Sequence, residues 1–347
     1  MLTIGFETSC DETSVSVVEN GMVLSNEVSS SVHLHSEYGG VVPEIASRHH
    51  VEYIVSVFEK ALSDSGKRKE DLELVAVTQG PGLPGSLLVG ITFAKAVSYA
   101  LDIPIIGVDH VQAHLYSPLL NTGAEMKNIL PFTGLVLSGG HTSVFECHDM
   151  LRPECIGRTL DDAVGEAFDK AAKIMDLGYP GGPLIEKMAR SYSGKKMSIF
   201  PKAYLKDSPG IDFSFSGIKT AVLYYFRASD KSDNEKIRIS FEFQEAVADV
   251  VMSKIKDAVE RTGHKRIIVG GGVINNERLR QAIKEFSEKA RIRLYIPEKQ
   301  YCSDNAAMVA GLGELLYASG IRMDLGINAE PNGTMDNKKL EKKIKKR

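Results

Sequence analysis

The sequence predicts an α/β protein made of two similar halves. Apolar strand-like segments alternate with segments of helical periodicity along the chain, a pattern typical of sheets with parallel pairing. A strand–turn–strand pattern opens the chain, and a second one begins near residue 131. The length of 347 residues exceeds what one hydrophobic core usually serves, so two domains are expected.

The first half opens with a short apolar strand, LTIGFE (2–7), which leads into the polar turn TSCDETS. SVSVVENGMVLSNEVSS then predicts a hairpin that turns at Asn20-Gly21, because Asn-Gly favours two-residue hairpin turns. The following segments predict a helix over 47–66, a strand over 72–79, a helix over 86–101 and a strand over 103–110.

The second half repeats this beginning, since TGLVL, SGGH and TSVFEC predict another hairpin. The segments after it predict helices around 161–175, 183–192 and 240–262, a strand over 266–272, a helix over 276–290, a strand over 292–297 and a helix over 304–320. We expect one domain from 1–108 with 301–330, and a second from 109–300 that holds a nucleotide and metal cleft. Residues 331–347 are expected to form a disordered basic tail.

Composition limits the class of protein. The N-terminus lacks the basic and apolar regions of a signal peptide, and no apolar run is expected to approach the roughly 18 residues of a membrane span. Four cysteines without a C-x-x-C spacing indicate a reducing cytosol and no disulfide framework. We therefore expect a cytoplasmic protein with no membrane association. The net charge of −3 argues against nucleic-acid binding, but seven basic side chains in 337–347 suit either phosphate contacts or a solvated terminus.

Two histidines, His110 and His114, lie one helical turn apart in HVQAH and suit a metal ion. Asp304 is a candidate third ligand, and its alternative role is to cap the helix that follows it. Two histidines and one carboxylate suit iron or zinc with open coordination positions. Val111 stands where the zinc-protease motif H-E-x-x-H has its glutamate base, which argues against a peptidase.

The turn after the first strand contains three carboxylates, Glu7, Asp11 and Glu12. Carboxylates at a strand end suit magnesium binding or proton transfer, and the alternative is a solvated turn. QGPGLPGS (79–86) has the spacing of a dinucleotide fingerprint, G-x-G-x-x-G. Its two prolines remove amides from the loop, so a structural glycine turn is favoured there over cofactor binding.

Glycine-rich turns predict an anion site. VLSGGHT (136–142) can aim backbone amides at an anion, and VGGGVINNERLR (269–280) has glycines where a strand meets a helix. Asn276 can either cap that helix or bind a purine edge. Asp169 and Glu186 flank a Gly-Gly loop and can reach ribose hydroxyls, although the loop also reads as an ordinary helix end. Together these turns predict a nucleotide cleft between the two halves.

Many ordered motifs give the chain a family resemblance over residues 1 to about 330. It resembles the tRNA N6-adenosine threonylcarbamoyltransferase (Kae/TsaD) family, once described as O-sialoglycoprotein endopeptidases. The motifs that carry this resemblance are ETSCDET, HSEYGGVVPEIASRHH, HVQAHLYSPLL, LSGGHT, DDAVGEAFDKAAK, YPGGP, DFSFSGIKT, GGGVINNERLR and CSDNAAM.

The resemblance implies a duplicated actin/hexokinase/Hsp70-like fold. It implies transfer of the threonylcarbamoyl group from threonylcarbamoyl-AMP to N6 of adenosine 37 in tRNAs that read ANN codons, with release of AMP. It also implies one divalent metal, Fe²⁺ first, with zinc or magnesium as alternatives, and ATP or ADP is a further candidate ligand. The implied partners are tRNA, the paralogous subunit TsaB and the P-loop ATPase TsaE.

The resemblance also assigns residues to roles by motif. The metal ligands are His110, His114 and Asp304. The residues that hold the phosphate or acyl part of the adenylate are Val136, Leu137, Ser138, Gly139 and Gly140, and those that hold its nucleoside are Asp169, Gly182, Glu186 and Asn276. The resemblance does not assign the base; we expect Asp11 or Glu12 to take the proton from N6, because both lie beside the expected cleft. The alternative functions are a non-catalytic nucleotide-binding scaffold and a metalloendopeptidase.

Overall fold

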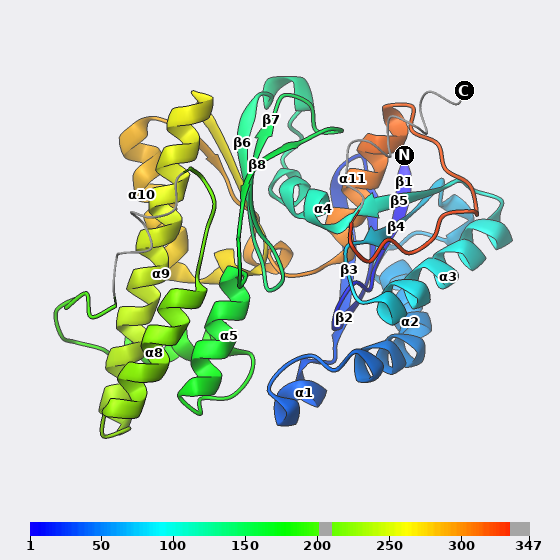
Figure 1. Cartoon of the computed structure of the whole chain (residues 1–347). Helices are drawn as coiled ribbons and strands as arrows, with labels where there is room; N and C mark the ends of the chain where they lie inside the picture. The colour runs from blue at the N-terminus through cyan, green and yellow to red at the C-terminus, as the bar shows by residue number, and fades with distance from the viewer. Residues whose placement is uncertain (201–209, 334–347) are drawn as a thin grey trace. The chain divides into compact units, whose positions relative to one another are not determined.

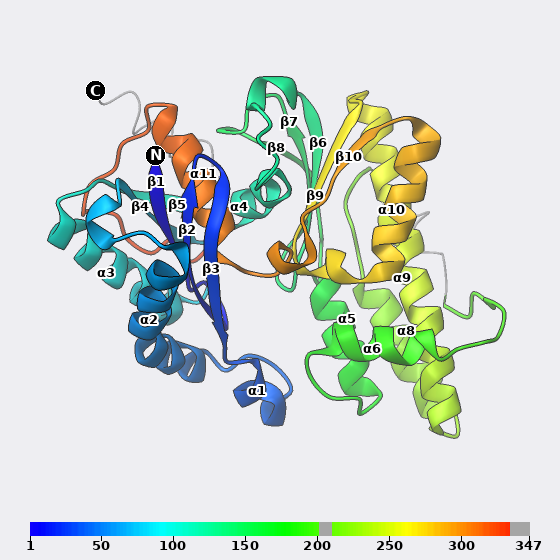
Figure 2. The same ribbon diagram turned by 180° about the vertical axis from the view of Figure 1, so that it is seen from behind.

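A computed structural model of the chain describes residues 1–200 and 210–333 and divides them into two compact units. The first unit comprises 1–128, 150–152 and the described residues from 297 onward, and the second comprises 129–149 and 153–296. Figures 1 and 2 show the chain from opposite sides. Most of the tail that the sequence predicts to be disordered, 334–347, lies outside the described residues.

The first unit is built on a five-stranded sheet of order β3-β2-β1-β4-β5. The first three strands form an antiparallel meander, and β4 and β5 run parallel to β1. Its strands are β1 (Leu2–Glu7), β2 (Glu12–Glu19), β3 (Met22–Ser30), β4 (Leu74–Gly80) and β5 (Ile105–Asp109). Its helices are α1 (Val32–His35), α2 (Pro43–Ser65), α3 (Pro84–Leu101), α4 (His110–Tyr116) and α11 (Ala306–Ala318).

The two faces of β1 are specialised because successive side chains of a strand point to opposite sides. Leu2, Ile4 and Phe6 pack with α2 and α3 in one hydrophobic core. On the other face, a Cβ at Gly5 would lie 2.5 Å from the Ala306 carbonyl oxygen, so α11 crosses the sheet there at close range. Glu7 lies two residues after Gly5, so its side chain points to the same face of the sheet, toward the start of α11.

The hairpin predicted at Asn20-Gly21 is confirmed. Both residues have positive φ, 52° and 76°, as a two-residue hairpin turn between right-handed twisted strands requires. The carboxylate of Glu314 on α11 accepts hydrogen bonds from both of their amides, at 3.1 and 2.7 Å. The turn is therefore held to the helix as well as by its own conformation.

The second unit repeats the sheet of the first. Its order is β10-β9-β6-β7-β8, with an antiparallel meander from β6 to β8 and with β9 and β10 running parallel to β6. Its strands are β6 (Phe132–Leu137), β7 (Thr142–Cys147), β8 (Glu154–Arg158), β9 (Arg266–Gly270) and β10 (Arg293–Tyr295). Its helices are α5 (Val164–Ile174), α6 (Gly181–Arg190), α8 (Ser216–Ala228), α9 (Asp233–Thr262) and α10 (Glu277–Ala290). The predicted duplication of an α/β half is confirmed.

The division between the units differs from the one expected at residues 108/109 and 300/301. The segment 109–128 belongs to the first unit, because α4 packs on α11 and Gln112 donates a hydrogen bond to the carbonyl of Met150. Both histidines of the pair thus fall in the first unit, whereas the sequence reading places them in the second. A cleft between the halves stays a prediction.

Helix α3 is long and apolar enough to cross a membrane by length and composition alone, contrary to the expectation that no segment reaches that length. Its buried residues Leu87, Ile91 and Ala94 pack in the core with β1 and α2. One face of α3 is therefore a core-packing face, as in an amphipathic helix of a globular domain.

Candidate metal centre and nucleotide-binding residues

The histidine pair stands at the start of a short helix that follows a buried strand. Asp109 ends β5 and caps α4, since its carboxylate accepts hydrogen bonds from the amides of Val111 and Gln112 at 2.9 and 3.1 Å. The helix therefore begins at His110 and brings His114 onto the same side one turn later. The two rings are buried, with centroids 4.6 Å apart.

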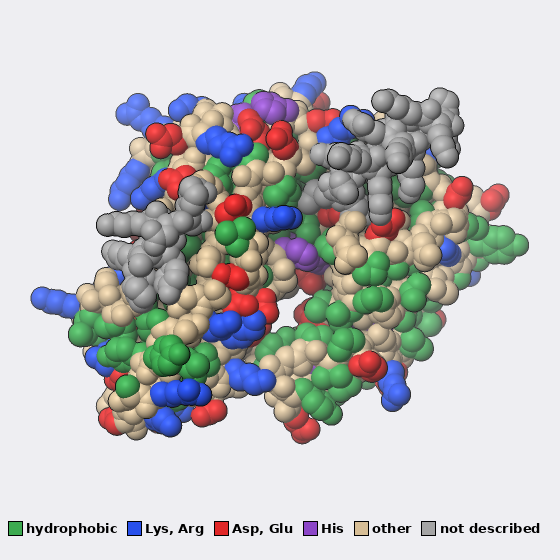
Figure 3. All heavy atoms as spheres, viewed as in Figure 1, with side chains coloured by type: hydrophobic (Ala, Val, Ile, Leu, Met, Phe, Trp, Pro, Cys, Tyr) green, Lys and Arg blue, Asp and Glu red, His purple; other side chains and the backbone are tan. Residues whose placement is uncertain are grey.

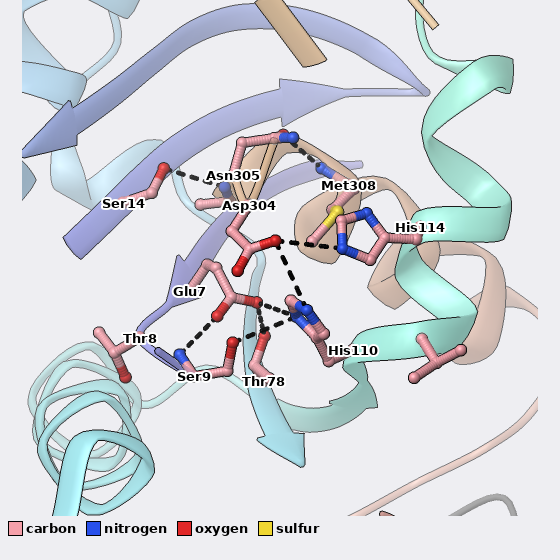
Figure 4. A network of polar contacts seen from close by, with 12 residues as sticks. Glu7, Thr8, Ser9, Ser14, Thr78, His110, His114, Asp304, Asn305 and Met308 are labelled. Atoms are coloured by element: carbon pink, nitrogen blue, oxygen red, sulfur yellow. Dashed lines mark hydrogen bonds and ion pairs between the residues drawn. The ribbon is translucent and has the colours of Figure 1, made fainter. Parts of the chain in front are cut away.

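Asp304 lies opposite the two histidines (Figure 4). Its Oδ1 is 3.6 Å from His110 Nε2 and 3.1 Å from His114 Nε2. The alternative role of Asp304 as a helix cap is wrong, because the neighbouring Asn305 caps α11 by accepting a hydrogen bond from the Met308 amide. Ligand atoms of the three residues all lie within 4.8 Å of one another, as a single metal ion requires.

Glu7 orients His110 from the side away from Asp304. Its Oε2 lies 3.0 Å from His110 Nδ1, while Oε1 accepts from the Ser9 amide at 2.6 Å and Oε2 accepts from the Thr78 hydroxyl at 2.5 Å. A carboxylate on Nδ1 holds the proton there and presents Nε2 toward Asp304, which is how histidines that bind metals are commonly fixed.

The charges around the pair favour a cation. Burial by itself would lower the pKa of His110, but the carboxylates of Asp304 and Glu7 raise it to about 9. Burial lowers the pKa of His114, whose Nε2 faces the Asp304 carboxylate and whose Nδ1 makes no hydrogen bond to the described residues. Burial alone would raise the pKa of Glu7, yet His110 brings it below its usual value. The three predicted ligands therefore fit a divalent metal, because two buried imidazoles and one carboxylate converge on one point.

Asp11 and Glu12 follow Glu7 at the turn between β1 and β2. Burial, and then the negative charges of Asp11 and Asp304, raise the pKa of Glu12 well above its usual value. The same three effects raise the pKa of the Cys10 thiol. The acidic turn is therefore electrostatically coupled to the metal ligands and is not an ordinary solvated turn.

The glycine turn of the second unit joins β6 to β7. Ser138 and His141 close it, with the Ser138 amide donating to the His141 carbonyl at 2.8 Å. Val136 and Leu137 have fully buried side chains in β6, so only their backbone can contact a ligand. The carbonyls of Ser138 and Gly139 accept the first amides of α5, at 3.2 Å each, which fixes the turn against that helix.

Three glycines in this unit have no steric reason to be glycine. A Cβ at Gly139, Gly140 or Gly182 would meet nothing within 4 Å, and none of the three has positive φ. By contrast, Gly271 has φ 99°, and a Cβ there would lie 2.5 Å from the Leu137 carbonyl oxygen. Glycine where the fold does not need it is typical of a place where a ligand approaches the backbone closely.

The three polar residues assigned to the nucleoside also serve the fold. Asp169 accepts from the Gly181 amide at 2.7 Å, at the start of α6. Glu186 on α6 accepts from Arg190 and from the Glu277 amide at the start of α10. Asn276 caps α10 and donates to Gln244 at 2.8 Å. These contacts place all three around the starts of α6 and α10, and their ligand contacts stay predictions.

The loop QGPGLPGS has the structural role that was favoured for it. A Cβ at Gly82 would lie 2.6 Å from the Ser9 carbonyl oxygen, and the Leu83 amide donates to the same carbonyl at 2.8 Å. The loop therefore packs against the backbone of the acidic turn and holds its Ser9 carbonyl in place. Glu7 is expected from the sequence only as one of three clustered carboxylates; its contact with His110 depends on the tertiary structure, and its place two residues after Gly5 on β1 is the signal that could have revealed it.

The sequence is similar to those of known proteins. The sequence model of one family, tRNA N6-adenosine threonylcarbamoyltransferase (TsaD), matches residues 22–311. A protein of that description from Thermosipho melanesiensis is 47% identical over 332 residues, which cover 96% of this chain and 99% of the relative. One from Thermodesulfovibrio yellowstonii is 45% identical over 334 residues, covering 95% and 98%.

A solved structure shares the fold at low identity. Component A of the Acidaminococcus fermentans (R)-2-hydroxyglutaryl-CoA dehydratase superposes with a TM-score of 0.52 at 14% identity, covering 92% of this chain and 99% of that one. At this identity the likeness concerns the fold alone. Together with the two repeated sheets, it establishes the duplicated actin/hexokinase/Hsp70-like fold.

Proposed function

From the premise that the chain belongs to the tRNA N6-adenosine threonylcarbamoyltransferase family, we propose how its residues carry out that reaction. The chain is a transferase that places a threonylcarbamoyl group on N6 of adenosine 37 in tRNA. We propose threonylcarbamoyl-AMP as the donor, AMP as the product that leaves, and tRNAs that read ANN codons as the acceptors. The donor is already activated as a mixed anhydride, so the protein must chiefly position both substrates and stabilise developing charge.

The observation that carries the proposal is the convergence of His110, His114 and Asp304 on one point, with Glu7 behind His110. These three ligands would hold one divalent metal, with Fe²⁺ proposed first and zinc or magnesium as alternatives. When bound, such an ion would polarise the carbamoyl oxygen or hold the phosphate of the donor. Glu7 holds a proton on Nδ1 of His110, so Nε2 is the nitrogen that would bind the ion after the ring has released its second proton.

The acidic turn supplies the proposed base. An exocyclic adenine amine must lose a proton as it is acylated, and a carboxylate within reach can accept it. Asp11 and Glu12 are the proposed acceptors, and for Glu12 the raised pKa, caused by burial and by the charges of Asp11 and Asp304, supports this role. The proposal fails if Asp11→Ala and Glu12→Ala proteins both keep the normal single-turnover rate with bound donor.

The second unit supplies the proposed nucleotide contacts. We propose that the amides of the turn from Ser138 to Gly140 hold the phosphate or acyl part of the donor, beside the backbone of Val136 and Leu137. Asp169, Gly182, Glu186 and Asn276 are the proposed nucleoside contacts. The open space above Gly139, Gly140 and Gly182 supports these assignments. ATP or ADP is a further proposed ligand of the same residues.

The proposed protein partners are the paralogous subunit TsaB and the ATPase TsaE. Figure 3 shows hydrophobic side chains gathered over α2 and α3. On α2, Val51 and Val55 lie one turn apart, with 64% and 50% of their surface exposed. Contiguous exposed apolar side chains mark protein interfaces, so we propose this face of the first unit as the surface that binds TsaB.

The decisive experiment uses purified protein with TsaB, TsaE, threonylcarbamoyl-AMP and unmodified tRNA, and detects the modified nucleoside by mass spectrometry. We expect product from the wild type and from His33→Ala, a matched control at an exposed histidine of the same unit. The His110→Ala/His114→Ala protein should give none. Equal product from the double variant, shown to be folded, would overturn the role of the metal centre; no product from any protein would favour a non-catalytic scaffold.

A further inference from the structure

A second group of potential metal ligands lies in the second unit, apart from the residues assigned to the nucleotide. It consists of Glu146 on β7, His148 just after β7, and His264 in the loop between α9 and β9. One ligand atom of each lies within 4.8 Å of the others. Neither the family assignment nor the proposed mechanism uses these residues.

The fold brings the three residues together from distant parts of the chain. β6 lies between β7 and β9 in the sheet (Figure 2). β7 runs antiparallel and β9 parallel to β6, so the end of β7 and the loop before β9 both lie at the start of β6. Glu146 pairs with Thr133 on β6, and the Thr133 hydroxyl bonds the Thr262 hydroxyl at 2.7 Å. Paired residues share a face of the sheet, so this contact holds the His264 loop on the face that carries Glu146.

The geometry within the group is that of a ligand set. Glu146 Oε1 is 3.1 Å from His148 Nε2 and 3.4 Å from His264 Nε2, and the two rings stand nearly perpendicular with centroids 5.3 Å apart. His264 is the telling residue: its side chain is only 9% exposed, and its Nε2 makes no hydrogen bond to any described residue. A buried polar atom without a hydrogen bond calls for an explanation such as an absent ion.

We propose that Glu146, His148 and His264 form a second site for a divalent transition-metal ion, of which Zn²⁺ is the best match. Two imidazoles and one carboxylate are a borderline ligand set that suits zinc, with water completing the coordination. His148 is largely exposed, so the site is reached from solvent. A bound ion would fasten the end of β7 to the loop before β9, across β6.

The test counts zinc ions in the full-length protein by equilibrium dialysis and elemental analysis, after both sites have been stripped with chelator. We expect two Zn²⁺ per wild-type chain and one in the His110→Ala/His114→Ala variant. Adding His148→Ala to that variant should remove the remaining ion or weaken its binding at least about 10–100-fold, the loss that outer-shell partners alone cause. Because His148 is exposed, its removal should leave the fold intact.

Two further variants keep the outcome unambiguous. Glu146→Gln in the same background keeps the side-chain shape but removes the anionic ligand, and it should weaken zinc binding as His148→Ala does. His33→Ala in that background should keep the one ion. Zinc retained by the triple variant with His148→Ala, or absent already from the His110→Ala/His114→Ala protein, would overturn the proposal.

Discussion

At the scale of single residues, Glu7 is the group that orients His110 as a metal ligand. It touches no proposed ligand atom, yet it fixes which nitrogen of His110 faces Asp304. Glu7→Gln should therefore keep the ligands and weaken metal affinity by about 10–100-fold, as loss of an outer-shell partner does. Competition with a fluorescent chelator measures the change, and Glu37→Gln, at an exposed carboxylate of the same unit, is the control. Unchanged affinity would reduce Glu7 to a structural role.

Metal binding at this site should release a proton. His110 has a pKa near 9 in the metal-free protein, so its ring is protonated at pH 7, and a ligand must give up that extra proton. Affinity should rise about tenfold per pH unit up to about pH 9 and then level off. Calorimetry in buffers of different ionisation enthalpy should show about one proton released per ion near pH 7, and none in a His110→Ala protein. A pH-independent affinity would contradict this.

The glycines of the second unit provide a matched pair. Gly182→Ala meets open space and should leave the stability within about 0.5 kcal/mol. It should weaken adenylate binding about tenfold, because the added methyl group would stand where the ligand is proposed to approach the backbone. In Gly271→Ala, the alanine would have to adopt the positive φ of Gly271, and its Cβ would clash with the Leu137 carbonyl. This variant should lower the free energy of unfolding by at least about 1–2 kcal/mol. Denaturant unfolding and nucleotide titration separate the two effects. Gly182→Ala with normal affinity would remove Gly182 from the site.

At the scale of elements, the approach of α11 to β1 positions Asp304. A Cβ at Gly5 would lie 2.5 Å from the carbonyl oxygen of Ala306, two residues after Asp304. Gly5→Ala should therefore shift α11, cost about 1–3 kcal/mol and lower metal affinity together. Gly40→Ala meets nothing within 4 Å and is the control. Lost stability with unchanged metal affinity would show that Asp304 does not depend on this packing.

Local chemistry explains which elements could be read from the sequence. The turn at Asn20-Gly21 and the glycine turn after β6 were predicted because their residues specify the conformation by themselves. Helix α8 has no counterpart among the predicted helices, because it opens with Ser216 and Gly217, which have low intrinsic preference for a helix. The third metal ligand was found as a candidate only, because its choice between capping and ligation depends on Asn305 taking the cap.

The boundary between the units was outside the reach of such reasoning. Whether 109–128 joins the first or the second unit depends on the contact of α4 with α11, about 190 residues later in the chain, and no local pattern encodes that contact. The same holds for Glu7, whose role appears only when β1, β4 and α4 are placed together. Tertiary contacts between distant segments decide both questions.

At the scale of the whole molecule, the apolar face over α2 and α3 leads to a prediction about assembly. Val51→Glu/Val55→Glu places charge in the proposed TsaB surface and should weaken that complex at least tenfold in a titration of the two proteins. Tyr224→Glu, at an exposed side chain on α8 in the second unit, should leave it unchanged. Equal affinities for wild type and double variant would exclude this face.

The repeated sheets place two turns in corresponding positions, one between β1 and β2 and the other between β6 and β7. The first carries a run of carboxylates, and the second carries bare glycine backbone. An ancestral duplication of one half would have supplied two copies of this hairpin, free to diverge in charge preference while the scaffold stayed the same. A turn suited to bind cations and a turn suited to bind anions can thus descend from one ancestor by side-chain replacement alone, on the same backbone.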